Sequence, residues 1–176
     1  RYRYNDETKR FVIETVKIEI DKVGVLTMSA RFELDQYPDF QKLRDPGQLL
    51  ALGGSFKLIG ARATFRNQDL VQHIVQAYAA SRGVDAAKAR EEIVDSLDRD
   101  RRKSKDPIQR EGLAAAIAFV KQPGSIEMVI APAAPVSLAA ATFLYAQSAR
   151  ELKRTLGLKI EAKPPAGAKP GAEPAR

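Results

Sequence analysis

The chain has 176 residues, 44% of them hydrophobic and 29% charged, which suits one folded domain with a sizeable core. It contains no cysteine, so disulfides, thiol catalysis and cysteine-ligated zinc or iron–sulfur sites are excluded. The net charge of +7 is spread thinly along the chain, which predicts a diffuse attraction to anionic surfaces without one dominant basic face.

The first residues predict antiparallel strands. Residues 1–4 form a short strand that leads into a polar turn. In residues 15–20, valine and isoleucine alternate with lysine and glutamate, and the same alternation runs through 26–34 after a turn at 21–24. Alternation with a period of two is typical of a sheet with one wet face. We therefore expect a hairpin here.

The next part of the chain predicts a connection and a strand. Residues 35–54 contain several prolines and glycines, which favour an irregular segment with a short helical turn at 46–52. A strand is expected at 55–66. Its apolar residues change parity at Gly60, and one extra residue at a glycine is typical of a β-bulge.

Capping residues mark the helices predicted in the second half. The first helix follows a cap at 67–69 and ends at Gly83. Helical spacing predicts that the buried stripe of this helix is Leu70, Val71, Ile74, Ala77 and Tyr78. A second helix starts at Asp85 and has an almost wholly charged outer face. A third starts at Asp106-Pro107.

The C-terminal part predicts a strand at 125–130, one final helix that starts at Ser137 and ends at Gly157, and a strand at 158–162. This unit forms a right-handed crossover if its two strands are parallel. Residues 163–176 are rich in proline, alanine and glycine and predict a disordered tail.

These elements together predict an α+β fold. Residues 1–162 form a single domain in which a curved, mainly antiparallel sheet of about five or six strands has one face covered by three or four helices. No apolar run is long enough for a transmembrane segment.

The densest basic run is the candidate binding site that the sequence offers. Its cations are Arg99, Arg101, Arg102, Lys103 and Lys105. They suit contact with an anionic surface, nucleic acid or an acidic partner, and they equally suit a helix C-terminus, where cations complement the helix dipole. No aromatic residue interleaves them, which makes stacking on nucleic-acid bases unsupported and nucleic acid a disfavoured partner.

A catalytic or cofactor site is not predicted. His73 is the only histidine, and Asp69 lies four residues before it, so the two side chains can meet on one helix face. With no second ligand or nucleophile in the sequence, we interpret His73 as a residue near a helix start. We expect no enzyme activity, no metal and no cofactor.

Three segments carry a resemblance: Leu58 to Leu70, Ala80 to Val84 and Phe119 to Val136. Their pattern resembles uncharacterised exported proteins of alphaproteobacteria and is more distantly similar to YdgA-like and AsmA-like envelope domains. The resemblance implies a place in the periplasm or on the periplasmic side of a membrane, with lipid or an envelope protein as partner. It implies no catalytic residue.

Two functions stay open. The first is a non-catalytic envelope module that binds an apolar ligand, a lipid or a partner protein between sheet and helices. The small-residue stretches at 114–118 and 139–141 motivate it, although alanines there equally allow close packing. The second is a binder of nucleic acid or an acidic partner through residues 99–105.

Overall fold

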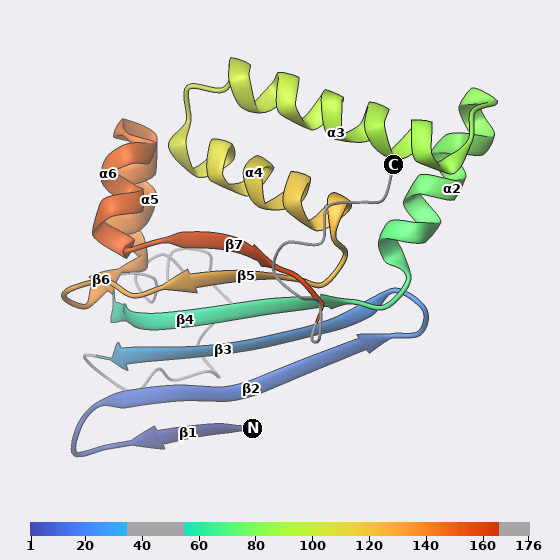
Figure 1. Ribbon diagram of the computed structural model, residues 1–176. Coiled ribbons are helices and arrows are strands. Elements are labelled where there is room, and N and C mark those ends of the chain that lie inside the picture. The colour runs from blue at the N-terminus through green and yellow to red at the C-terminus, as the bar shows by residue number, and fades with distance from the viewer. Residues whose placement is uncertain (35–54, 166–176) are drawn as a thin grey trace, which may run out of the picture.

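The computed structural model describes residues 1–34 and 55–165 (Figure 1). The predicted helical turn at 46–52 and the predicted tail beyond residue 165 lie outside these ranges. The strands are β1 (Tyr2–Asn5), β2 (Arg10–Ile20), β3 (Gly24–Leu34), β4 (Phe56–Asn67), β5 (Ser125–Ile130), β6 (Val136–Ser137) and β7 (Lys159–Lys163). The helices are α2 (Leu70–Arg82), α3 (Ala86–Lys103), α4 (Pro107–Lys121), α5 (Leu138–Gln147) and α6 (Ala149–Leu156).

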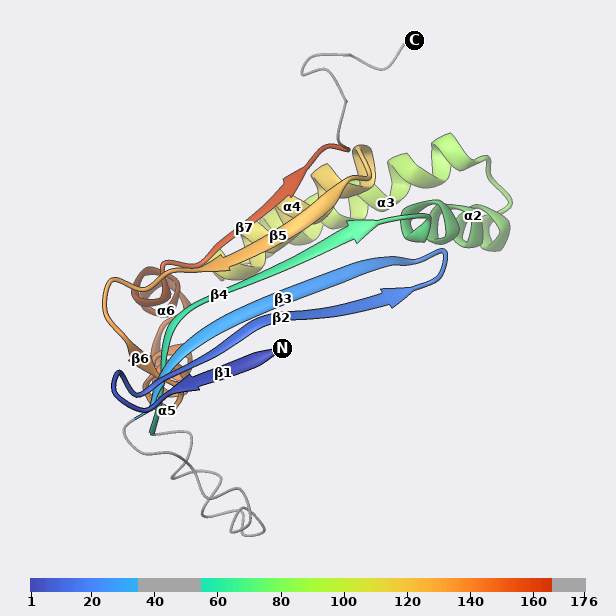
Figure 2. The same cartoon turned by 90° about the horizontal axis from the view of Figure 1, so that it is seen from below.

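The described strands form one antiparallel sheet in the order β1-β2-β3-β4-β5-β7, and the short β6 pairs with the start of β4. The predicted α+β fold is confirmed, with seven strands in the described part of the chain. Helices α3 and α4 lie above the β5–β7 side of the sheet, α2 rises from the end of β4, and α5 and α6 stand at the other end (Figure 1). Seen from below, β5 passes in front of α4 (Figure 2).

Strand alternation explains why the helices share one side. Phe65 of β4 pairs with Leu26 of β3, which in turn pairs with Ile18 of β2, so these apolar side chains share one face. On that face the Phe65 ring lies edge-on to Phe119 of α4, with centroids 6.1 Å apart. Phe119 is buried in a cluster that joins α2, α3 and α4. A second cluster of four buried leucines joins β4 to α6 and the start of β7: Leu58, Leu152, Leu156 and Leu158.

The predicted bulge at Gly60 is confirmed. Arg31 of β3 pairs with Gly60, but the next residue, Phe32, pairs with Leu58, so Ile59 is the extra residue. Because of this inserted residue, the apolar side chains of β4 lie on the helix-covered face both before and after the bulge.

The possible parallel crossover at 126–162 is wrong, because β5 and β7 are antiparallel. The amide of Ala131, just after β5, donates to the carbonyl oxygen of Leu156 at the end of α6, at 2.9 Å. Helices α5 and α6 therefore bring the chain back to the end at which β5 finished. From there β7 can only run back along β5, and it extends to Lys163, one residue beyond the predicted strand.

The predicted cap of α2 at residues 67–69 is found, but Asn67 makes it and Asp69 does not. Asp69 precedes the helix but makes no side-chain cap, and its φ and ψ of −128° and 7° are not the extended values of a capping residue. Instead Asn67 Oδ1 accepts the amide of Val71 at 3.1 Å. The buried stripe also differs, since Val71 and Val75 are buried whereas Ile74 is 48% exposed.

The predicted single final helix is two helices. Ser148 is extended, with φ −161° and ψ 111°, and interrupts the helix between α5 and α6. Its amide closes α5 on the carbonyl oxygen of Leu144 at 2.8 Å, and its hydroxyl accepts the amide of Glu151 at 3.3 Å. The predicted caps at Asp85, Asp106, Ser137, Gly83 and Gly157 are all found.

Replacing Gly157 should destabilise the fold more than replacing Gly83. Both glycines end helices in the left-handed region, at φ 56° and 66°. A Cβ at Gly83 meets nothing within 4 Å, whereas one at Gly157 lies 2.3 Å from the carbonyl oxygen of Ala131. We expect Gly83→Ala to cost about 1–2 kcal/mol from backbone strain alone and Gly157→Ala about 2–5 kcal/mol. Urea unfolding of both variants measures the difference, and equal losses would contradict it.

Glu127 should make the free energy of unfolding depend on pH in the acid range. This carboxylate on β5 is buried, and it accepts hydrogen bonds from Lys163 of β7 and Arg62 of β4. The hydrogen bond from Lys163 is the main cause that holds the pKa of Glu127 below its ordinary value of 4.5. Because the folded-state pKa is the lower one, the stabilisation is present above pH 4.5 and is lost as the pH falls through the folded-state value.

We therefore expect Glu127→Gln to lower the free energy of unfolding at pH 7 by about 1 kcal/mol, with a difference from wild type that shrinks towards pH 3. Unfolding curves between pH 3 and 7 check this. The control is Glu91→Gln, which removes an exposed carboxylate that pairs with Lys88 at 2.9 Å. A deficit in Glu127→Gln that is constant over this pH range would contradict the assignment.

Candidate functional site

The two faces of the sheet differ sharply in polarity. The face under the helices is apolar, and the opposite face carries most of the charged side chains of β1 to β5. Among the residues that the structure describes, that polar side has hollows of about 430, 270 and 200 Å³. The first of these is the candidate site. We call it the arginine hollow, and it is lined by Arg3, Tyr4, Asn5, Thr8, Arg10, Val12 and Arg31.

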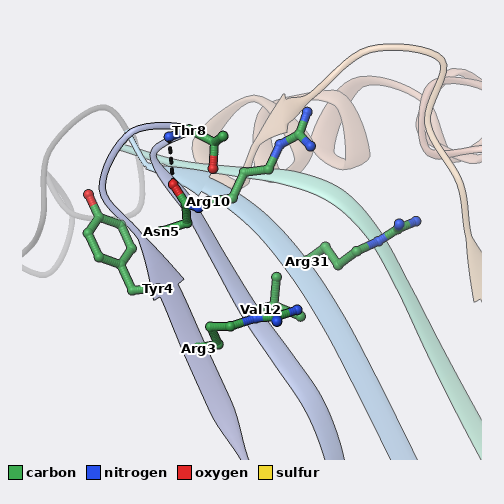
Figure 3. A pocket seen from close by; sticks show the side chains of 7 residues that line it. All are labelled: Arg3, Tyr4, Asn5, Thr8, Arg10, Val12 and Arg31. Carbon is green, nitrogen blue, oxygen red and sulfur yellow. Dashed lines mark hydrogen bonds between the residues drawn. The ribbon is translucent and has the colours of Figure 1, made fainter.

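Three adjacent strands position the arginines of this hollow. Arg3 of β1 pairs with Val12 of β2, and Val12 pairs with Arg31 of β3. Directly paired residues share a face, and Arg10 precedes Val12 by two residues on the same strand, so all three arginines project to one side. Figure 3 shows their side chains on that side, with the Tyr4 ring pointing away from them.

A tight turn between β1 and β2 closes one end of the hollow. Asn5 Oδ1 accepts the amide of Thr8 at 2.9 Å (Figure 3). Lys9 has a positive φ of 52°. The acid of the turn, Asp6, accepts a hydrogen bond from Lys9 Nζ at 2.7 Å. This bond lowers the pKa of Asp6, so the carboxylate is charged and already has a cation beside it.

The arginines of the hollow have few counter-charges. Arg3 lies 3.7 Å from a carboxylate oxygen of Glu14. Within residues 1–34 and 55–165, Arg10 and Arg31 make no side-chain hydrogen bond or ion pair. Glu33 is the cross-strand partner of Arg10, yet no ion pair joins them. The hollow thus holds two guanidinium groups that lack a partner in the described part of the chain.

The guanidinium of Arg31 lies beside Gly60. A Cβ at Gly60 would lie 3.4 Å from Nη2 of Arg31 and 3.3 Å from the carbonyl oxygen of Ile130. Arg31 also lines the second hollow, of about 270 Å³, together with Arg62. Arg62 differs from Arg31 because its guanidinium is bound to Glu127.

The apolar face is incompletely covered. The helices lie over the β5–β7 half, and on the β1–β2 half Tyr2, Ile18 and Ile20 are 75%, 45% and 55% exposed. Val16 is exposed as well. We call the surface made by Tyr2, Val16, Ile18 and Ile20 the open apolar face. Within residues 1–34 and 55–165, no strand pairs with the outer edge of β2 beyond residue 15, since β1 pairs with residues 10–13 and Arg1 bonds the backbone of residues 14 and 15.

The predicted basic site lies at the end of α3 and in the loop that follows. Asp98 accepts hydrogen bonds from Arg101 Nε and Nη2 at 2.9 and 2.6 Å, and from Arg102 Nε at 2.7 Å. The hydrogen bonds from Arg101 are the first cause of a lowered pKa for Asp98. Two of the five predicted cations are thus engaged locally, while Arg99, Lys103 and Lys105 are exposed. A role of these five residues in binding stays a prediction.

The remaining candidates do not come together as a site. His73 and Asp69 are both exposed, and the bond between them is a backbone one, from the His73 amide to the Asp69 carbonyl oxygen at 2.9 Å. Among the described residues, no group of three histidine, cysteine or acidic side chains is placed to hold a metal ion.

Sequence reasoning missed the arginine hollow. Alternation alone places Arg31 on the polar face, but the register that brings Arg3 and Arg10 beside it depends on the tight turn at residues 5–10. The parity of the apolar residues in β2 was an available signal. It changes between Ile13 and Val16, where the pairing with β3 shifts register.

Comparison with known proteins identifies one family that the chain matches. No curated protein and no solved structure matches the chain. Residues 17–163 match the model of a family described as "Uncharacterized protein". The match covers residues 17–20 at the end of β2 and every later strand and helix that the structure describes. It includes Arg31, Ile18 and Ile20, and it leaves out Arg3, Arg10 and the other two residues of the open apolar face. The chain therefore belongs to this family of uncharacterised proteins.

Proposed function

We propose that this chain is a non-catalytic module of the cell envelope, on the periplasmic side, that binds the acyl chains of a lipid on the open apolar face. The observation that carries the proposal is the exposure of Ile18 and Ile20 at 45% and 55% on the face that elsewhere forms the core. The envelope location is supported by the sequence resemblance at Leu58 to Leu70 and Phe119 to Val136.

The energetics support an apolar ligand. Full burial of one exposed isoleucine side chain is worth about 1.5–3 kcal/mol. Because Val16, Ile18 and Ile20 are 38%, 45% and 55% exposed, covering all three supplies about half of the combined value, or about 2–4 kcal/mol. Contiguous exposed apolar side chains are typical of interaction sites. Their side chains offer no hydrogen-bonding group, so the covering ligand has to be apolar along its contact, as an acyl chain is.

The charge of the protein favours an anionic lipid. The net charge is +7, and a positive field draws anionic head groups to the molecule. No helix in the described ranges is long and apolar enough to cross a membrane.

The double variant Ile18→Thr/Ile20→Thr tests the open apolar face. Threonine keeps the β-branched shape that suits a strand but adds a hydroxyl to the surface that would contact the acyl chain. We expect purified wild-type protein to retain extractable lipid, seen by native mass spectrometry, and to bind dansyl-undecanoic acid saturably. The double variant should bind this probe at least tenfold more weakly.

The matched control is Lys17→Thr, which changes the same strand on its polar face and should leave the dansyl-undecanoic acid affinity unchanged. Thermal unfolding should show that both variants are folded. A wild-type protein that carries no lipid and does not bind the probe, or equal binding by the double variant, would refute the proposal.

A further inference from the structure

We propose that the arginine hollow binds the phosphate group of a phosphorylated ligand. The hollow lies on the polar face of the sheet, opposite the open apolar face, so this site is independent of the lipid-binding proposal. Its cations are Arg3, Arg10 and Arg31.

The fold requires polar residues at these positions but not three cations. Alternation directs Arg3, Arg10 and Arg31 to the wet face, where any polar side chain satisfies the sheet. Arg3 and Arg31 pair with Val12 from its two sides, so two like charges lie on one face with only Val12 between them, and like charges repel each other. Three arginines around one hollow therefore add repulsion that the fold itself does not need and that a bound anion removes.

The charges nearby leave the hollow open to an anion. Glu14 approaches Arg3 alone, at 3.7 Å, and Asp6 is held by Lys9. In the described ranges, the guanidinium groups of Arg10 and Arg31 have no carboxylate within ion-pair distance. Two arginines with free hydrogen-bond donors thus face a space that no acidic side chain fills.

The shape of the hollow favours phosphate with an organic group attached. A guanidinium is a planar fork that binds two oxygens of a phosphate at once. The guanidinium of Arg31 lies beside the bulge at Gly60, and the Asn5–Thr8 turn closes the other side. The volume of about 430 Å³ falls in the range of small-molecule sites. It exceeds what one phosphate group fills, so the ligand is a phosphate ester.

Isothermal titration calorimetry with glycerol 3-phosphate, and sedimentation with phosphatidylglycerol vesicles, test the site and separate a soluble ester from a lipid head group. We expect wild-type protein to bind at least one of these two probes. Arg10→Gln/Arg31→Gln should weaken that binding by about a hundredfold, or tenfold for each arginine. Arg10→Lys/Arg31→Lys keeps the charges but loses the forked donors. Its affinity should lie between that of the wild type and that of Arg10→Gln/Arg31→Gln.

The matched control is Arg99→Gln/Lys103→Gln, which removes the same charge from the predicted basic run on α3 and should leave binding unchanged. Thermal unfolding of each variant shows that the fold is kept. Binding of neither probe by the wild type, binding unaffected in Arg10→Gln/Arg31→Gln, or a loss that the α3 control reproduces would each overturn the proposal.

Discussion

The pairing of β3 with β4 is the constraint on which the rest of the molecule depends. These two strands pair along their whole lengths, from Gly24 opposite Asn67 to Leu34 opposite Phe56. A slip of one residue would turn every apolar side chain of β4 to the wet face. Gly24 helps to hold the register, because a Cβ there would lie 2.4 Å from the carbonyl oxygen of Arg66.

This register gives the sheet one apolar face, which has to be buried, and one polar face, which can contact solvent. The chain between β4 and β5 folds into α2, α3 and α4, and α4 packs over β7 and β5, where Gly112 lies close to Ile160. Coverage thus falls on the C-terminal half of the sheet. The N-terminal half keeps the same apolar alternation, with exposed side chains on β2. The open apolar face and the arginine hollow are therefore opposite sides of the same strands.

Local sequence signals predict where helices and strands begin, end or bulge, but they predict less well how these elements pack together. The caps at Asp85, Asp106 and Ser137, and the bulge at Gly60, depend on neighbouring residues and were predictable. The antiparallel course of β7 depends on a hydrogen bond between Ala131 and Leu156, which are 25 positions apart (156 − 131), and no local pattern reports it. Ile74 shows the same limit, since helical spacing marks an apolar stripe but not which apolar residues a neighbouring helix covers.

The candidate sites were less predictable still, because they arise from two irregularities in the strands. In β2, Glu14 and Thr15 fall at the register shift between Ile13 and Val16; in β4, Ile59 is inserted opposite β3. Each shift keeps the apolar residues on one face while it bends the strand. On β3, Arg31 lies between the two shifts, and its guanidinium lies beside Gly60. The irregularities that preserve the apolar face thus also shape the hollow on the other side, so a shift of register near Arg31 would change both faces.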